Sequence, residues 1–216
     1  TVRPAFSGKV WKWFSETAMI QLHYNPSLIE AGCDEAGRGC LAGPVFAAAV
    51  ILPSDFHEPR LRDSKKLSPS LRYKLREIIL HYALAWGIGM ASPAEIDRLN
   101  ILRASFLAMH RAIDKLSITP DSLLIDGNRF ISYNKIPYHC FVKGDDLYAP
   151  VAAASVLAKT FRDDYMVQLH EEFPHYGWNK NKGYPTLFHR QALALNGPSP
   201  HHRRSFLHPV QKELFT

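Results

Sequence analysis

Short apolar runs alternate with longer amphipathic segments along most of the chain, and this alternation predicts an α/β domain. Five of the apolar runs have the length and composition of β-strands: 28–34, 45–52, 83–90, 122–126 and 138–142. The first three follow one another closely enough to form a meander, whereas the last two come after helical segments, as parallel strands do. The expected sheet is therefore mixed and has five strands.

Helices are predicted where apolar residues recur every three or four positions behind a capping residue. Ser68 and Pro69 open one such helix, which runs to about residue 81. Ser92, Pro93 and Glu95 have the spacing of a capping box with proline at the first helical position. Further helices are expected at about 101–116, from 148 or 150 to 172, and over a short stretch at about 185–195. These helices would flank the sheet.

The chain divides into three expected parts. Residues 1–18 are rich in aromatic side chains and form an extension to which no function is assigned. Residues 19–174 carry the α/β pattern. After Pro174, histidine, asparagine, lysine, glycine and proline become frequent, so 175–216 is expected to be a small helical part.

Composition and charge narrow the class of protein. The 216 residues are 46% hydrophobic and 21% charged, as in a globular chain, and 26 Lys and Arg against 20 Asp and Glu leave a formal charge of +6. This balance favours a polyanionic partner. Three irregularly spaced cysteines argue for a reducing interior. No apolar run approaches the roughly 18 residues that span a bilayer, so we expect a cytoplasmic protein without a membrane partner.

A pair of adjacent acidic residues carries the first chemical signal. Asp34 and Glu35 end the first predicted strand, and Gly37, Arg38 and Gly39 follow directly. Adjacent carboxylates beside an arginine between glycines suggest that a hard divalent cation and a phosphate bind in the same place. The sequence therefore predicts a metal-dependent nuclease.

The motif around this pair resembles the opening motif of ribonuclease HII, the type 2 ribonuclease H family. Further matches follow in family order, and Cys40 is a departure, because many members have proline there. Together they cover roughly residues 28–210. The matching segments are Asp34-Glu35-Ala36-Gly37-Arg38-Gly39, Leu41-Ala42-Gly43-Pro44-Val45, Asp63-Ser64-Lys65-Lys66-Leu67, Leu124-Ile125-Asp126-Gly127, Lys143-Gly144-Asp145, Ala152-Ala153-Ala154-Ser155, Ala158-Lys159, Arg162-Asp163, Lys182-Gly183-Tyr184-Pro185-Thr186 and His202-Arg203-Arg204-Ser205-Phe206.

The resemblance implies that Asp34, Glu35, Asp126 and Asp145 bind the metal and form the catalytic centre. Each stands at or just beyond the end of a predicted strand, so a sheet that pairs those strands would bring them together. Close carboxylates repel one another, and a divalent cation relieves the repulsion. Oxygen-only ligands favour Mg²⁺ or Mn²⁺. Two such ions about 3.5–4 Å apart would activate water and stabilise the leaving 3′ oxygen.

Two features of this set leave alternatives open. Neighbours on a regular strand point to opposite faces, so Asp34 and Glu35 reach one ion only if the strand ends there or one of them uses its carbonyl. Asp145 could face the metal while Asp146 caps the next helix. The resemblance, and not the spacing, selects Asp145. Asp163 and Asp164 lie inside a helical pattern beside Arg162, where a solvated ion pair is expected.

The resemblance also implies substrate contacts. Gly37, Arg38 and Gly39 would read the ribose 2′-hydroxyl through main-chain groups, and Tyr184 would pack on the sugar of the following deoxynucleotide. Lys65 and Lys143 are the best candidates for phosphate contacts. Other candidates are Lys66, Lys159, Lys180, Lys182, Arg203 and Arg204, and each of these could equally be a solvated surface residue. Ser155 would contact substrate or serve as a small packing residue.

The implied fold is ribonuclease H-like, with 19–174 as the catalytic domain and 175–216 contributing substrate contacts. The implied reaction is hydrolysis of the RNA strand of RNA/DNA hybrids and cleavage on the 5′ side of single ribonucleotides in duplex DNA. It would leave 5′-phosphate and 3′-hydroxyl ends. The implied cofactor is Mn²⁺ or Mg²⁺, with two ions during catalysis, and the expected state is a monomer.

Two rival functions are distinguishable. Another nuclease or strand-transfer enzyme on this fold would cut DNA that contains no ribonucleotide. A non-catalytic hybrid-binding module would show no metal dependence. A structural zinc site has little support, because the sequence contains no Cys-x-x-Cys pair. P-loop nucleotide hydrolysis and serine-hydrolase chemistry lack support as well, because neither a P-loop nor a Gly-x-Ser-x-Gly elbow occurs.

Overall fold

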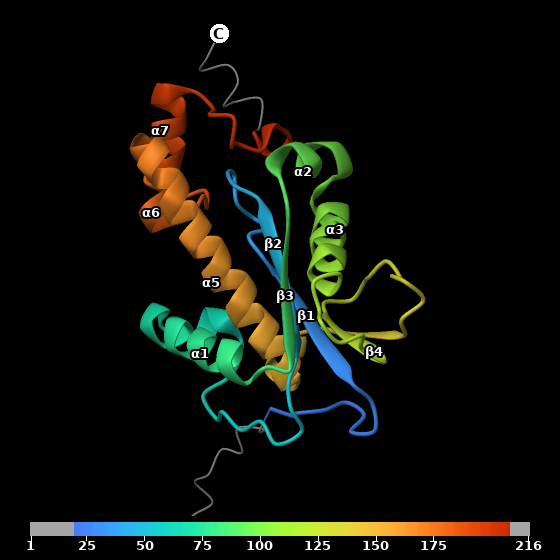
Figure 1. The fold of residues 1–216 in the computed structure, drawn as a ribbon. Coiled ribbons are helices and arrows are strands. Elements are labelled where there is room, and N and C mark those ends of the chain that lie inside the picture. Colours follow the sequence, from blue (N-terminus) through green and yellow to red (C-terminus); the bar gives the residue numbers. More distant parts are fainter. Residues whose placement is uncertain (1–19, 208–216) are drawn as a thin grey trace, which may run out of the picture.

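The computed structural model describes residues 20–207, which form a five-stranded sheet with helices on both faces (Figure 1). The expected extension, residues 1–18, lies outside the described residues. The strands in spatial order are β3 (Ala85–Ala91), β2 (Val45–Ile51), β1 (Glu30–Ala36), β4 (Ser122–Asp126) and β5 (Tyr138–Phe141). β1, β2 and β3 form an antiparallel meander, whereas β4 runs parallel to β1 and β5 parallel to β4. The predicted mixed sheet is confirmed.

The helices begin where the capping signals predict. Ser68 caps α1 by accepting from the Leu71 amide, and Ser92 and Glu95 form the predicted capping box of α2. Among residues 20–207 there is no helix long and apolar enough to cross a membrane. The helices are α1 (Pro69–Tyr82), α2 (Pro93–Leu99), α3 (Ile101–Ile113), α4 (Gly144–Leu147), α5 (Ala149–Glu172), α6 (Trp178–Asn181) and α7 (Leu187–Asn196), with 3₁₀ turns at Ser64–Lys66, Pro174–Tyr176 and Arg204–Phe206.

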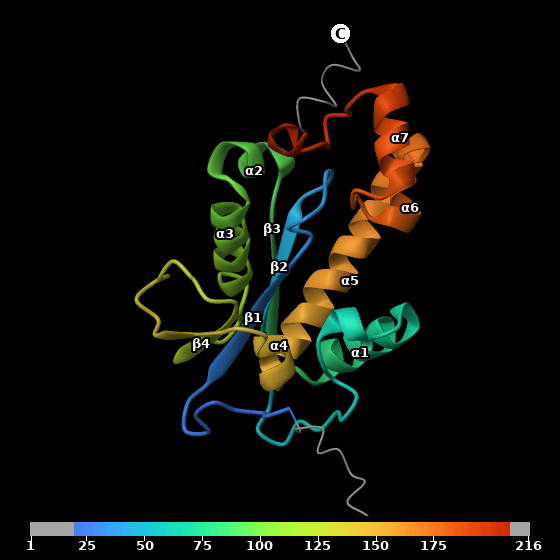
Figure 2. The same ribbon diagram turned by 180° about the vertical axis from the view of Figure 1, so that it is seen from behind.

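The sheet separates two apolar cores. Because successive residues of a strand point to opposite faces, Ala47 and Ala49 of β2 pack toward α3, while Ala48 and Val50 pack toward α1 and α5. α2 and α3 cover one face, and α1 and α5 cover the other (Figure 2). Alternation of strand residues therefore decides which helix each side chain meets.

The long helix α5 lies directly against β1. A Cβ atom at Gly32 would come within 2.1 Å of the Pro150 carbonyl carbon, so only glycine permits this approach. Buried alanines at 152, 153 and 154 keep the contact close over the next turn. This packing brings Ser155, in the first third of α5, close to Asp34 of β1.

The boundaries of β1 correct one expectation about the site. The strand was expected to end at Asp34, but antiparallel pairing with β2 continues to the pair Ala36 and Phe46. Asp34 and Glu35 therefore lie within a regular strand. The extra pairs form because β2 begins at Val45 and its first residues lie beside the end of β1.

The segment after α5 folds back along it. Buried Met166 and Leu169 of α5 pack with Tyr176, Trp178 and Leu193 in a small apolar cluster. α6 and α7 lie beside one end of α5 (Figure 1). The structure thus holds the Tyr184 segment against the end of the sheet where β1 stops.

Candidate active site

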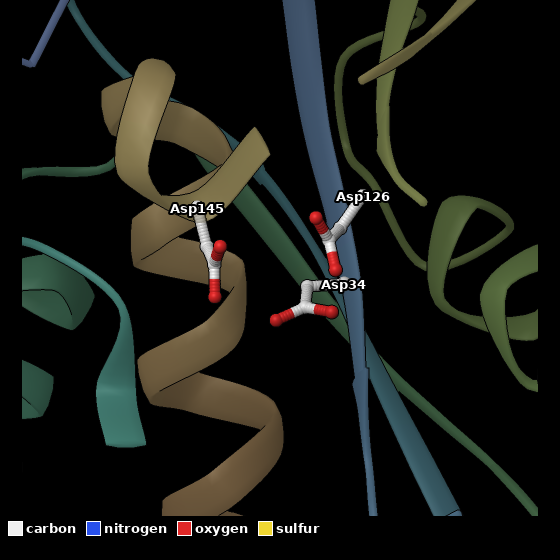
Figure 3. A group of neighbouring side chains, drawn as sticks. All are labelled: Asp34, Asp126 and Asp145. Atoms are coloured by element: carbon white, nitrogen blue, oxygen red, sulfur yellow. The ribbon is translucent and has the colours of Figure 1, made fainter. Parts of the chain in front are cut away.

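Three of the four predicted carboxylates converge (Figure 3). Asp34 comes from β1, Asp126 from the end of β4 and Asp145 from α4. One carboxylate oxygen from each lies within 4.8 Å of the others. We call these three residues the carboxylate cluster.

The carboxylate cluster forms because β1 and β4 pair in a defined register and because α4 begins beside the end of β4. Cys33 of β1 lies opposite Ile125 of β4, so Asp34 and Asp126 are the next residues on two parallel neighbours. The Gly144 amide then donates to Asp126 Oδ1 at 2.8 Å, which ties α4 to the end of β4. Lys143 precedes α4 with a left-handed φ of 60° and turns the chain so that Asp145 stands in the first turn.

Burial and like charge disfavour ionisation in the cluster. Asp34 and Asp145 are only 2% and 4% exposed. Burial, and then the charges of Glu35 and Asp126, hold the pKa of Asp34 well above its usual range. Burial, and then the charge of Asp126, raise the pKa of Asp145 to about 7. A bound cation would reverse these effects.

One carboxylate oxygen of the cluster is buried and free to bind a cation. Asp34 Oδ1 accepts from the Glu35 amide at 2.7 Å, but buried Oδ2 finds no hydrogen-bond partner within residues 20–207. An unpaired buried carboxylate oxygen is costly. Three oxygen donors from closely spaced carboxylates fit a hard divalent cation such as Mg²⁺ or Mn²⁺.

Glu35 lies near the cluster without joining it. Its strand position places it on the opposite face of β1 from Asp34, and its Oε1 accepts from Arg38 Nη1 at 3.0 Å. Burial raises the pKa of Glu35, Arg38 lowers it, and the charge of Asp126 raises it. Because β1 stays regular through this point, the expected break that would let both residues reach one ion does not occur.

Asp146 does not cap the next helix. Its carboxylate instead pairs with Lys66 Nζ at 2.6 Å, and Tyr148 begins α5 without a side-chain cap. Asp145 and Asp146 both lie in α4, a short helix that the sequence did not predict. Asp145 belongs to the carboxylate cluster, and it also lies in a second acidic group with Asp63 and Asp146, in which one oxygen of each residue is within 4.8 Å of the others.

The two lysines and the serine that were predicted to contact substrate differ in exposure. Lys65 is exposed, with Nζ 3.9 Å from Asp145 Oδ2, and Lys143 is exposed at the start of α4. Ser155 is buried, its hydroxyl lies 2.9 Å from that of Ser64, and it lowers the pKa of Asp34. The packing role that the sequence left open fits this burial better than a substrate contact.

Gly37 occupies a position that only glycine tolerates. Its φ is +94°, and a Cβ atom would lie 2.0 Å from Arg162 Nε. Arg38 and Gly39 are exposed, and a Cβ at Gly39 would meet open space. We call Gly37, Arg38 and Gly39 the Gly-Arg-Gly loop. One side of this loop is packed against buried arginine, and the other is open.

Two fully buried arginines hold the main chain around this loop. Arg162 donates to the carbonyls of Pro44, Ala42 and Lys182 at 3.0, 3.1 and 2.9 Å. Arg203 holds further carbonyls of the same region. Asp163 and Asp164 form ion pairs as expected, Asp163 with Lys159 and Asp164 with Arg76, but Arg162 takes part in neither. Arg203 is no phosphate contact, because it is fully buried.

Tyr184 lies beside the Gly-Arg-Gly loop. The Leu41 amide donates to the Gly183 carbonyl at 2.8 Å, which joins the two segments. The Tyr184 side chain is 38% exposed, and its ring centroid lies 5.7 Å from Lys159 Nζ and 5.9 Å from Arg162 Cζ. The two segments predicted to contact substrate are therefore neighbours.

Two buried histidines, His189 and His202, form a hydrogen-bonded chain that ends at the main-chain carbonyl of Tyr184. Trp178 Nε1 donates to His189 Nε2 at 3.0 Å, so His189 carries its proton on Nδ1 and donates it to the Tyr184 carbonyl at 2.9 Å. The Ser199 amide donates to His202 Nδ1 at 3.0 Å, so His202 donates from Nε2 to His189 at 3.1 Å. Both rings are neutral, and burial lowers the pKa of His202 to about 3.

A mixed sheet with a buried carboxylate cluster, an adjoining glycine loop and surrounding lysines defines a divalent-metal-dependent nuclease. The family model for ribonuclease HII matches residues 31–208. The chain belongs to the ribonuclease HII family and is an endoribonuclease that acts on the RNA of RNA/DNA hybrids. The expected ribonuclease H-like fold is confirmed as well.

Similar proteins extend over nearly the whole chain. Ribonuclease HII of Bacteroides thetaiotaomicron is 63% identical over 188 residues, which cover 87% of this chain and 94% of that protein. Ribonuclease HII of Parabacteroides distasonis is 62% identical over 197 residues, covering 91% and 99%. Both identities are high enough to carry the family assignment.

Solved structures show the same fold. Ribonuclease H2 from Pyrococcus horikoshii superposes with a TM-score of 0.69 at 25% identity, covering 86% of this chain and 96% of that one. The ribonuclease HII of a PCNA:RNase HII complex from Archaeoglobus fulgidus gives 0.69 at 28% identity, covering 84% and 96%.

Proposed function

We propose that this protein, besides acting on RNA/DNA hybrids, cuts on the 5′ side of single ribonucleotides in duplex DNA. The products would carry 5′-phosphate and 3′-hydroxyl ends. One observation carries the proposal: the Gly-Arg-Gly loop and Tyr184 are joined through the Leu41 to Gly183 hydrogen bond and lie beyond the end of the strand that holds Asp34. The Gly-Arg-Gly loop would then test for a ribose in one nucleotide, and Tyr184 would contact the deoxyribose of the next.

The carboxylate cluster would hold the divalent ions. Asp34 with its unpaired Oδ2, Asp126 and Asp145 would supply the oxygen ligands, and Glu35, whose side chain lies on the other face of β1, would complete the set through its main-chain carbonyl. Bound Mn²⁺ or Mg²⁺ supplies the positive charge that activates water and stabilises the leaving oxygen. The oxygen-only donor set suits either ion, so both belong in the assay.

The remaining predicted residues would position the duplex. Lys65 and Lys143 are exposed near Asp145, where they would contact phosphates and carry no sequence information. Tyr184 presents part of its ring at the surface beside the loop. With these contacts on one chain, the protein would act as a monomer in the cytoplasm, and 175–216 would contribute Tyr184 to substrate binding.

The decisive experiment compares three duplexes that differ only in sugar. A DNA duplex with one ribonucleotide, the same duplex without it, and an RNA/DNA hybrid are incubated with Mg²⁺ or Mn²⁺. We expect cutting of the first and third, with the first cut directly 5′ of the ribonucleotide. Equal cutting of the all-DNA duplex would favour the rival DNA nuclease, and metal-independent binding without cutting would favour the hybrid-binding module.

A further inference from the structure

Arg203 places a charged guanidinium directly beneath the Gly-Arg-Gly loop. Its Nη2 donates to the Gly37 carbonyl at 2.7 Å, Nη1 to the Arg38 carbonyl at 2.8 Å and Nε to the Gly43 carbonyl at 2.9 Å. The residue is fully buried. All its hydrogen bonds within residues 20–207 go to main-chain carbonyls, and none goes to a carboxylate.

Together with the Cys40 amide, which donates to the Gly37 carbonyl at 3.4 Å, these contacts fix the direction of two amide groups. Every peptide bond within residues 20–207 is trans, and in a trans peptide the carbonyl of one residue and the amide of the next point in opposite directions. Because the Gly37 and Arg38 carbonyls point at Arg203, the amides of Arg38 and Gly39 point away from it. The structure gives neither amide a protein acceptor within residues 20–207.

The side toward which these amides point is open. Arg38 and Gly39 are exposed, and nothing lies within 4 Å of the position that a Cβ at Gly39 would occupy. Two neighbouring main-chain donors with free space before them suit an oxygen acceptor of a ligand. A ribose 2′-hydroxyl offers such an acceptor, whereas a deoxyribose does not.

The burial of Arg203 carries a cost that a purely structural residue would avoid. Desolvation lowers the pKa of Arg203 to about 10, yet the group stays charged at neutral pH. An apolar side chain would fill the same volume without desolvating a charge. What a guanidinium adds is a planar fork whose donors meet several carbonyls at once. The Arg203 amide, bonded to the Leu41 carbonyl at 2.8 Å, and the Phe206 ring hold this fork in place.

We propose that Arg203 is a positioning residue for ribose recognition: it turns the Gly37 and Arg38 peptides so that the Arg38 and Gly39 amides face the 2′-hydroxyl. This inference rests on the proposed function, since it requires that the Gly-Arg-Gly loop tests the sugar. Arg203 itself touches no substrate. Its effect is therefore on the preference between sugars and not on general duplex binding.

The test uses Arg203→Lys, which keeps the charge and the stem but replaces the fork by a single ammonium. Binding is measured in the Asp126→Asn background, without cleavage, to a duplex with one ribonucleotide and to the same all-DNA duplex. We expect the preference for the ribonucleotide to fall about tenfold for each amide that loses its direction, and the affinity for all-DNA duplex to stay the same. Arg111→Lys is the matched control.

The control separates positioning from stability. Arg111 also donates to a main-chain carbonyl, that of Met90 at 2.8 Å, and pairs with Glu95 at 2.7 Å. Arg111→Lys should lower the melting temperature and leave the sugar preference unchanged. If Arg203→Lys lowers the melting temperature and keeps the full preference, the assignment of Arg203 is overturned. If the Asp126→Asn protein with Arg203 intact binds both duplexes equally, ribose sensing itself fails, whatever Arg203 does.

A second measurement covers the case in which Arg203→Lys does not fold. Amide resonances of Arg38 and Gly39 are followed in ¹⁵N-labelled Asp126→Asn protein while either duplex is added. Shifts of both amides with the ribonucleotide duplex, and not with the all-DNA duplex, are expected. Equal shifts with both duplexes, or no shift with either, would overturn the inference.

Discussion

Asp126→Asn should stabilise the metal-free protein while it abolishes cleavage. Asparagine keeps the shape of the side chain, and its Oδ1 can still accept from the Gly144 amide, which now lies 2.8 Å from Asp126 Oδ1. The change therefore removes a negative charge from the carboxylate cluster and leaves the link between β4 and α4 in place. Stability without metal then reports the repulsion within the cluster.

The structure sets the size of this effect. At 4.8 Å, the limit that encloses the three oxygens, two full charges repel by about 3.5 kcal/mol at an effective dielectric constant of about 20. Partial protonation relieves some of this repulsion, because the pKa of Asp145 is about 7. We therefore expect a gain of about 1–2 kcal/mol at pH 8. For a chain of this size that gain raises the melting temperature by about 2–8 °C.

The gain should depend on pH in a defined direction. The pKa of Asp145 rises from 3.8 to about 7 on folding, so the native state holds a proton that the unfolded state has released. The metal-free wild type therefore loses stability as pH rises from about 4 to about 7. The advantage of Asp126→Asn should be full above pH 7 and shrink toward pH 4, as the carboxylates of the native state take up protons and cease to repel one another.

Thermal unfolding in EDTA at pH 8 and pH 5 measures this advantage, and a repeat with Mn²⁺ should stabilise the wild type more than the variant. Asp55→Asn is the control: it removes the same charge from an exposed position, and it should not appreciably change the melting temperature in EDTA or with Mn²⁺. A variant that melts at or below the wild type in EDTA at pH 8 would refute the proposed repulsion. Substantial residual cleavage would remove Asp126 from the metal site.

Three further changes test the surroundings of the cluster. Tyr184→Ala should reduce cleavage at isolated ribonucleotides more than within long hybrids, and equal losses in a cleavage assay would argue against junction sensing. Gly37→Ala should destabilise the protein by about 2–4 kcal/mol in urea unfolding, because its Cβ meets Arg162 at a positive φ; a wild-type midpoint would contradict this geometry. His202→Asn should lower the free energy of unfolding at neutral pH. It should also make that free energy decrease less steeply as the pH falls from about 6.5 to about 3. The reason is that the neutral His202 of the native state, with its pKa lowered to about 3, makes the wild type lose stability as the unfolded state takes up a proton. Parallel pH profiles of the variant and the wild type would show that His202 does not stay neutral.

Local sequence patterns were sufficient for most of the fold. The five strands follow from short apolar runs, and β4 has the predicted bounds, Ser122–Asp126. The capping box at Ser92 identified α2, because a cap involves only residues within one turn. The short helix α4 escaped prediction, since a single turn has too few residues for a periodic signal.

The site could be predicted only in part. Convergence of Asp34, Asp126 and Asp145 followed from the expectation that strand ends meet in one sheet. The separate position of Glu35 depends on how far β1 stays paired with β2, and this register is a property of two strands together. A sequence pattern places a residue on a strand but does not say where pairing stops.

By itself the sequence determined the order of strands and helices, the acidic residues and the family motifs, because each of these depends on neighbours along the chain. Only the tertiary structure decided that Arg162 and Arg203 are buried supports and not solvated contacts. Arg203 lies 166 positions from Gly37, and Arg162 lies 118 from Pro44. A charged side chain is buried only where distant segments supply its acceptors, and those acceptors come together only when the whole sheet has formed.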